Sequence, residues 1–225
     1  KWISDLSSVI FQMKSADSFQ ICYDLCRKAL AEFPNSPSLL FVWAQAKLNE
    51  ARLLEDEALH REALDLYQQA DKASPNNKQL LFNWAVATMQ LARKTKEEQL
   101  YKDTFAKLEL LIQTDAGKDT VLYQQYAGSM LLYSLDMGKI EECKERIEAM
   151  IQKSESITEN SGAYYQTQLQ ALLGNSDKAF EYLDKAIQFD SETIKAVEKN
   201  PVFESIRTDE RFAEIIEKHQ NRVTE

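Results

Sequence analysis

Apolar side chains recur along this sequence at steps of four and three residues, a spacing that places them on one face of an α-helix. The clearest instance is Ala63, Tyr67, Ala70 and Pro75. The proline ends such a helix, because the residue before a proline avoids helical geometry. The same steps predict four further helices, at Cys22, Cys26, Ala29, Pro34; Thr104, Leu108, Leu111, Ala116; Cys143, Ile147, Met150, Glu155; and Ala179, Leu183, Ala186, Ser191.

A second pattern precedes most of these helices: a large aromatic residue followed directly by a small one. Trp43-Ala44, Trp84-Ala85 and Tyr126-Ala127 lie 41 and 42 residues apart. A small residue lets a neighbouring helix approach closely while the aromatic ring fills the space beside it. The chain is therefore predicted to repeat a two-helix unit, in pairs near 1–14 and 17–33, 37–53 and 56–73, 77–94 and 96–114, 119–137 and 139–153, and 160–173 and 176–189.

Local signals agree with an all-helical chain. Only 5 glycines and 4 prolines occur in 225 residues, which favours long helices over strands joined by tight turns. Ser36 with Pro37 reads as an N-cap followed by a first-turn proline, and Asp119 with Thr120 can cap another helix. Ser176 marks a further helix start.

These patterns resemble the tetratricopeptide repeat, a helix-turn-helix unit of 34 residues. Ala63-Tyr67-Ala70-Pro75 matches the second-helix half of the family pattern residue for residue, and Gly138 and Gly174 stand where the family often has a turn glycine. The longer period is interpreted as one extra turn on each helix. The resemblance implies an all-α, right-handed superhelical solenoid of about five repeats over residues 1–191.

Residues 192–225 do not repeat and are predicted to be capping helices that hide the last apolar face of the array. Asn200-Pro201 reads as a cap and first helical residue, and Thr208 can cap a last helix. That helix carries one apolar stripe, formed by Phe212, Ile215, Ile216 and His219.

The resemblance also implies a binding surface, because the first helices of successive tetratricopeptide repeats line a concave groove. The groove positions can be assigned if Trp43, Trp84 and Tyr126 take the leucine position of the family pattern. The wall is then aromatic and amide-rich, which suits an extended or helical peptide. The alternative is that Phe41 and Phe82 pack between repeats and leave the groove merely polar. The candidate groove residues are Phe41, Gln45, Asn49, Phe82, Asn83, Val86, Gln90, Gln124, Gly128, Tyr164 and Gln168.

One known family activity, a clamp for a C-terminal carboxylate, is not expected. Asn83 matches the middle asparagine of that clamp, but Gln124 and Gln125 stand where its cations belong. An amide cannot replace a charge-assisted contact.

Catalytic chemistry is not expected either. Cys22 and Cys26 occupy core positions of the repeat, where a free cysteine acts as a small apolar side chain. The two histidines, His60 and His219, have no sequence tie to Cys143, and no glycine-rich phosphate loop exists. We therefore expect no enzymatic activity, no cofactor and no metal site.

Charge and hydropathy limit the partners. A net charge of −9 repels nucleic acid and anionic membranes. The longest apolar run, residues 39–44, is far shorter than the roughly 20 residues of a membrane span. Three cysteines favour a reducing, cytoplasmic setting. The sequence begins at Lys1 rather than at a methionine, so an upstream leader or anchor stays open.

Together these features predict a protein–protein interaction scaffold or adaptor that binds a peptide or protein segment in its groove. The alternative is a regulatory or dimerisation domain of a larger enzyme or of a secretion or assembly machinery, including a secretion-chaperone-like role. The sequence specifies neither the partner nor the oligomeric state.

Overall fold

The computed structural model describes residues 16–114 and 119–223, and every regular element in these ranges is a helix. The chain divides into two compact units, Lys1–Leu111 and Ile112–Glu225. The predicted all-α fold of sequential helix pairs is confirmed. The first helix expected, at 1–14, lies outside the described residues, and the division at residue 191 stays a prediction.

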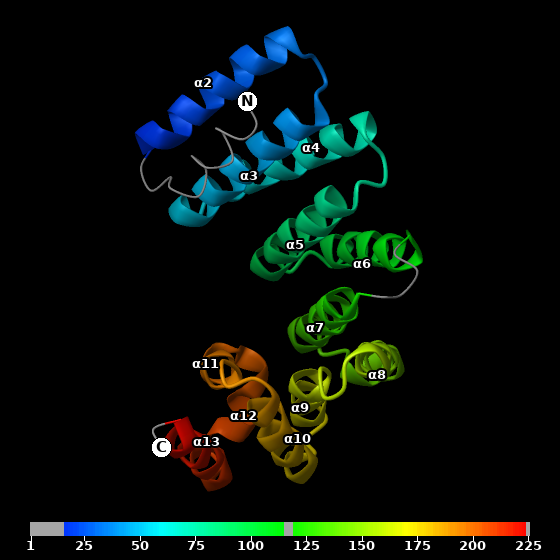
Figure 1. Ribbon diagram of the computed structural model, residues 1–225, viewed down its shortest axis with the longest axis vertical. Helices are drawn as coiled ribbons and strands as arrows, with labels where there is room; N and C mark the ends of the chain where they lie inside the picture. Colours follow the sequence, from blue (N-terminus) through cyan, green and yellow to red (C-terminus); the bar gives the residue numbers. More distant parts are fainter. Residues whose placement is uncertain (1–15, 115–118, 224–225) are drawn as a thin grey trace. The chain divides into compact units, whose positions relative to one another are not determined.

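The first unit consists of long helices that follow one another in antiparallel pairs (Figure 1). The strongest pairing joins α3 to α4, while α2 packs on α3 and α4 packs on α5. α3 and α5 are the first helices of their pairs, and α4 and α6 are the second. The bounds are α2 Ala16–Glu32, α3 Pro37–Leu54, α4 Glu57–Ala73, α5 Lys78–Thr95 and α6 Glu98–Thr114, whose last three residues fall in the second unit.

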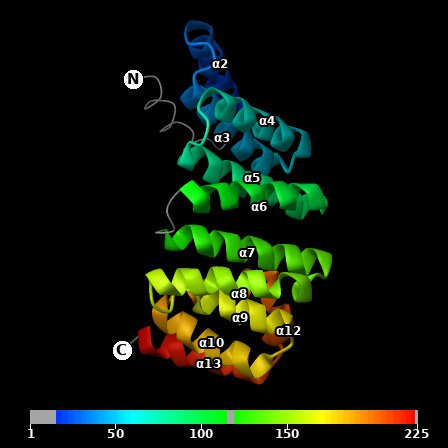
Figure 2. The ribbon, with the colours of Figure 1, turned by 90° about the vertical axis from the view of Figure 1, so that its right-hand side faces the viewer.

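The second unit continues the alternation and then departs from it. α7 pairs with α8, and α9 pairs with α10 (Figure 2). The shorter elements after α10 pack back onto earlier helices: α13 lies on α10, and η1 contacts both α7 and α9. The bounds are α7 Thr120–Met137, α8 Ile140–Ile157, α9 Ala163–Leu172, α10 Ser176–Phe189, α11 Thr193–Lys199, η1 Pro201–Phe203, α12 Glu204–Arg207 and α13 Glu210–Val223.

The helix ends repeat with the same period as the helices. Each first helix α3, α5 and α7 ends at a residue in the left-handed region, namely Glu55, Lys96 and Gly138, at φ of 54°, 58° and 66°. Asn35 and Asn76, which follow the second helices α2 and α4, also have positive φ. Glycine adopts this conformation without steric strain, whereas other L-residues adopt it at a cost. The turn role predicted for Gly138 is thus confirmed.

Most of the predicted caps are confirmed. The Asp119 carboxylate accepts a hydrogen bond from the Val121 backbone N–H at 2.9 Å. Ser36 occupies the predicted cap position before Pro37, but its side chain makes no capping hydrogen bond. The cap assigned to Thr208 is wrong by one residue, because the Asp209 side chain accepts the bond from the backbone N–H of Arg211 at 3.1 Å. The predicted start of a helix at Ser176 is confirmed, since α10 runs from Ser176 to Phe189.

The apolar faces of the repeat form the core as the spacing predicts. Cys22 and Cys26 are completely buried in a cluster with Phe19 and Ala29. In the second unit, the predicted stripe of α13 packs through Phe212 and its neighbours onto α10.

Gly162, at the start of α9, lies against α8 so closely that a Cβ atom there would come within 2.6 Å of Ile151 and 2.8 Å of Glu155. Its lack of a side chain is what permits this approach.

Candidate functional site

The neighbouring first helices α3 and α5 of the first unit leave a pocket at each end of their shared surface, which we call the α3–α5 surface. The pocket at their amino ends, the amino pocket, has a volume of about 210 Å³. The pocket at their carboxyl ends, the carboxyl pocket, has a volume of about 520 Å³. The amino pocket is lined by Pro37, Ser38, Phe41, Val42, Asn77, Gln79 and Leu80, and the carboxyl pocket by Ala51, Arg52, Glu55, Asp56, His60, Gln90 and Lys94.

Phe41 packs inside its own helix pair and also lines the amino pocket. Its ring meets the buried Tyr67 ring of α4 edge-on, with centroids 5.9 Å apart, so it packs within the repeat. The residue is only partly buried, and its remaining surface lines the amino pocket. Phe82 on α5 is also partly buried.

The other groove candidates on α3 and α5 are partly buried, except for the exposed Gln90. Gln45 and Val86 are partly buried, and Asn83 donates to the Gln79 carbonyl of its own helix at 2.8 Å. Gln90 is exposed and Asn49 is partly buried. The amides of Gln90 and Asn49 both accept hydrogen bonds from one side chain.

That side chain is Arg52, which the repeat pattern does not select. Its Nε and Nη2 donate to Gln90 Oε1 at 3.0 and 2.8 Å, and its Nη1 donates to Asn49 Oδ1 at 3.4 Å. The two amides expected to bind a peptide backbone instead hold a guanidinium group in place. The carboxyl end of the α3–α5 surface therefore carries an oriented cation, in a pocket that Glu55 and Asp56 also line.

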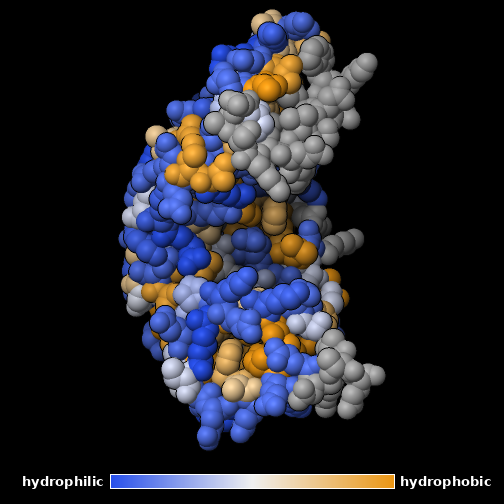
Figure 3. Space-filling view, turned by 90° about the vertical axis from the view of Figure 1, so that its left-hand side faces the viewer, coloured by the Kyte–Doolittle hydropathy of each residue, from blue (hydrophilic) through white to orange (hydrophobic). Residues whose placement is uncertain are grey.

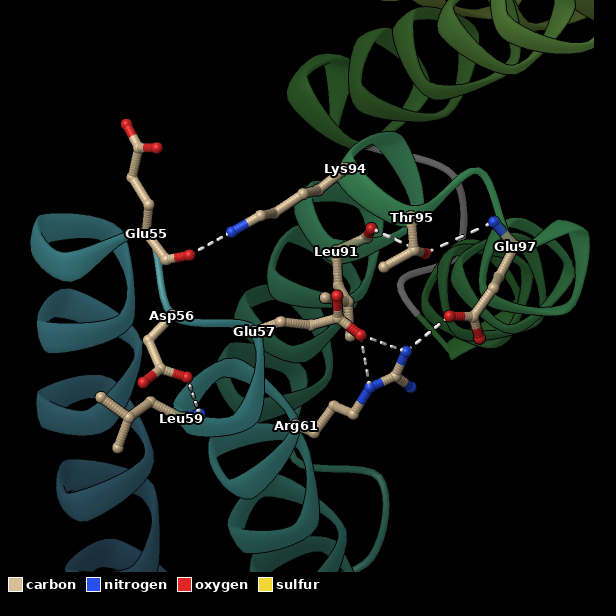
Figure 4. A network of polar contacts seen from close by, with 9 residues as sticks. All are labelled: Glu55, Asp56, Glu57, Leu59, Arg61, Leu91, Lys94, Thr95 and Glu97. Carbon is tan, nitrogen blue, oxygen red and sulfur yellow. Dashed lines mark hydrogen bonds and ion pairs between the residues drawn. The ribbon is translucent and has the colours of Figure 1, made fainter.

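A second cation, Lys94 of α5, reaches the same pocket. Its ammonium group donates to the backbone carbonyl of Glu55 in the loop between α3 and α4 (Figure 4). Nearby, Arg61 bridges the carboxylates of Glu57 and Glu97 and so links α4 to the residue that precedes α6.

His60 forms the floor of the carboxyl pocket. It is buried, and its Nε2 lies 2.8 Å from the carbonyl oxygen of Ala87, a geometry that requires Nε2 to carry the proton. Burial lowers the pKa of His60, and the positive charges of Arg52 and Lys94 lower it further. His60 is thus a buried side chain bonded to α5, and its lowered pKa keeps it neutral near pH 7.

In the second unit, part of the predicted groove is covered by the chain itself. The Asn200 side chain donates to the Tyr164 hydroxyl at 3.0 Å and to Gln168 Oε1 at 3.2 Å. Phe203 packs against the Tyr164 ring with centroids 5.6 Å apart, and Gln168 is 2% exposed. The segment 200–203 therefore occupies the α9 face that sequence reasoning gave to a partner.

The other two candidates of this unit also make internal contacts. Gln124 donates to the Ser161 carbonyl at 2.8 Å, and a Cβ atom added to Gly128 would come within 3.1 Å of the Tyr165 ring. A pocket of about 300 Å³ remains beside them, and the exposed Phe189 forms part of its rim. Gln124 and Tyr164 line that pocket, whereas Gly128 and Gln168 do not.

The described residues offer little other chemistry. Within 16–114 and 119–223, no three His, Cys, Asp or Glu side chains are grouped so that they could hold a metal ion. None of the described helices is both long and apolar enough to cross a membrane. The face drawn in Figure 3 is mostly hydrophilic, with small apolar patches separated by polar ones.

No protein-family profile and no curated protein matches the sequence. Among solved structures, TTC0263, a thermophilic TPR protein of Thermus thermophilus, superposes with a TM-score of 0.57 and 16% identity, covering 86% of this chain and 94% of that one. The chain has the fold of the tetratricopeptide-repeat (TPR) proteins. The MamA RS-1 ArsTM double mutant is similar as well, with a TM-score of 0.59 and 13% identity over 86% of this chain and 97% of that one. The TPR resemblance drawn from the repeat pattern is thereby confirmed at the level of fold.

Proposed function

We propose that this TPR-fold chain is a protein-binding scaffold without catalytic activity of its own, and that it binds a peptide segment on the α3–α5 surface. The observation that carries the proposal is the pair of pockets between two successive first helices. Each contains a residue selected for the groove from the repeat pattern alone: Phe41 in the amino pocket and Gln90 in the carboxyl pocket.

The dimensions of the surface suit a short segment. Phe41 and Arg52 are separated by eleven residues of α3, or about 16 Å along the helix axis. About five residues of extended chain span that length, as do about eleven residues of helix. A segment of this size can place one apolar side chain against Phe41 and one polar side chain beside Arg52, with Gln45 and Asn83 between them.

An intramolecular contact in the second unit supports the binding of a short segment on a first-helix face. There the segment 200–203 lies on α9 and contacts α7, held by an amide donor and by a tilted contact between two aromatic rings. A first-helix face of this chain can therefore hold a short non-repeat segment. Gln124 and Tyr164 beside the remaining 300 Å³ pocket form a second, smaller binding area in this proposal.

Site-specific photo-crosslinking tests the proposal. A benzoylphenylalanine residue replaces Gln45 or Asn83 in the full chain, and the matched control carries it at Gln69, an exposed position of α4. Adducts with a protein from the native source are expected at the two α3–α5 positions and not at the control. Adducts that form only at Gln69, or at no position although the partner co-purifies, would place the binding surface elsewhere.

A further inference from the structure

We propose that the carboxyl pocket is a carboxylate subsite, in which Arg52 and Lys94 bind an Asp or Glu side chain of the segment held on the α3–α5 surface. The inference rests on the proposed function and adds the chemistry of the partner. Both cations line the same 520 Å³ pocket.

Arg52 is held in position but is not neutralised. A guanidinium group has five N–H donors, and three of them are used on Gln90 and Asn49. One N–H on each terminal nitrogen is left for a ligand. Both partners are neutral amides, so the full positive charge of Arg52 remains available to an anion.

Lys94 is in a similar position. One of its three N–H donors bonds the Glu55 carbonyl oxygen, again a neutral partner. Two carboxylates line the pocket, but neither pairs with a cation of the pocket in the described structure. The Glu55 carboxylate points away from Lys94, and the Asp56 carboxylate caps α4 through the Leu59 N–H at 3.1 Å (Figure 4).

Cations in the last turn of a helix often serve only to stabilise the negative end of the helix dipole. Arg52 does not follow this pattern, because it reaches across to α5 and binds Gln90, 38 residues away in sequence. Lys94 likewise reaches from α5 to the loop after α3. Both cations line the carboxyl pocket beside His60, and after burial their charges are a lesser cause of its lowered pKa.

We assign to the pocket a side-chain carboxylate, presented by a segment that continues beyond the carboxyl pocket. A terminal carboxylate is the alternative occupant that the peptide experiment distinguishes. A carboxylate placed against both cations forms charge-assisted hydrogen bonds, which are stronger than neutral ones. The chain as a whole carries a net charge of −9 and repels acidic peptides, so any preference for an acidic residue must come from a local contact.

A random peptide library tests the subsite. Twelve-residue segments, long enough even as a helix to span the distance of about 16 Å from Phe41 to Arg52, are fused to a carrier through their carboxyl end, so that the segment has no free terminal carboxylate. The wild-type chain is expected to enrich segments with Asp or Glu at one fixed position. Replacing that acid by its amide should weaken binding by about tenfold or more, as expected for a lost charge-assisted contact.

The protein variant Arg52→Gln with Lys94→Gln completes a double-mutant cycle. It should bind the acid and amide peptides equally, while Arg27→Gln with Lys28→Gln, an equal charge change on exposed positions of α2, keeps the full discrimination. Arg52→Lys, which keeps the charge but loses the fork of donors, should give an intermediate result, with folding of every variant verified by circular dichroism.

Each remaining outcome counts against a specific claim. Enriched segments without a fixed acidic position, or equal discrimination by the Arg52/Lys94 variant, would overturn the carboxylate subsite and leave peptide binding standing. Synthetic peptides that bind only with a free carboxyl terminus would show that the side-chain assignment is wrong. A wild-type chain that enriches no segment at all would overturn the proposed function as well.

Discussion

Replacing Asn200 by alanine tests how the C-terminal segment is held in the second unit. The side chain has two separate tasks. Its oxygen accepts a hydrogen bond from the Val202 N–H at 3.1 Å and so caps η1. Its amide nitrogen donates to the Tyr164 hydroxyl and to Gln168 Oε1, which fixes the segment to α9.

The expected cost follows from these two tasks. Loss of an N-cap costs about 1 kcal/mol. Gln168 is 2% exposed, so its oxygen is left without a partner in a buried place, at a cost of about 1–3 kcal/mol. We therefore expect Asn200→Ala to lower the free energy of unfolding by about 2–4 kcal/mol.

Urea unfolding followed by far-UV circular dichroism measures the total, and hydrogen exchange with mass spectrometry locates it. Exchange should accelerate in peptides that cover residues 193–207. Asn77→Ala is the matched control, because Asn77 is exposed and its side chain only caps α5, through the Leu80 N–H at 3.1 Å. It should cost about 1 kcal/mol.

Asn200→Asp separates the two tasks, since aspartate caps as well as asparagine but offers no N–H to Gln168. Asn200→Asp should therefore keep the cap contribution of about 1 kcal/mol and lose only the contribution of the hydrogen bond to Gln168. An Asn200→Ala variant that costs no more than Asn77→Ala, or a neutral Asn200→Asp variant, would refute the claim that this amide anchors the segment to α9.

Three further predictions concern stability and reactivity. Gly162→Ala should lower the free energy of unfolding by about 1–3 kcal/mol, because the added Cβ overpacks the contact with α8. Gly138→Ala has open space around it and should lose only about 1–2 kcal/mol, the cost of a left-handed backbone at alanine. Urea unfolding measures both variants. Because the folded state lowers the pKa of His60, stability should fall as the pH drops below about 6.5, where the unfolded chain binds the proton. In the His60→Gln variant, the free energy of unfolding should depend less on pH between about pH 7.5 and about pH 5.5. An unchanged slope in this variant would contradict the assignment of the pH dependence to His60. Cys22 and Cys26, both 0% exposed, should react with a thiol reagent such as DTNB only after urea is added, and rapid native labelling would contradict their burial.

The sequence predicts the fold well because two independent signals repeat with one period. The steps of four and three place buried residues such as Cys26 and Tyr67 on one face, and cap chemistry places helix starts such as Asp119 within a residue. Both signals depend only on residues close together in the sequence, so they can be read without knowing which other helix packs against the one predicted. The error at Thr208 is of the same local kind, since Asp209 beside it is an equally good cap.

The candidate site is predicted less completely, because its chemistry depends on pairs of helices. The period correctly places Gln168 on a first-helix face, yet it cannot show that Asn200, 32 residues later, covers that face. The sequence does not single out Arg52, because a lone arginine in the last turn of a helix is typical of a solvated position. Its significance appears only when Gln90 of α5 is seen to hold it.

This difference changes what kind of partner the surface favours. Free amides at Asn49 and Gln90 would bind the neutral backbone of almost any extended peptide, and selectivity would then rest on Phe41 alone. With both amide oxygens directed at Arg52, the same two residues fix the orientation of a charge, so less side-chain entropy is lost when an anion binds. At physiological ionic strength, screening acts over about 8 Å, so this charge discriminates through direct contact rather than through long-range attraction. Selectivity for an acidic side chain is therefore a local property of the carboxyl pocket, and it is compatible with a chain whose net charge is −9.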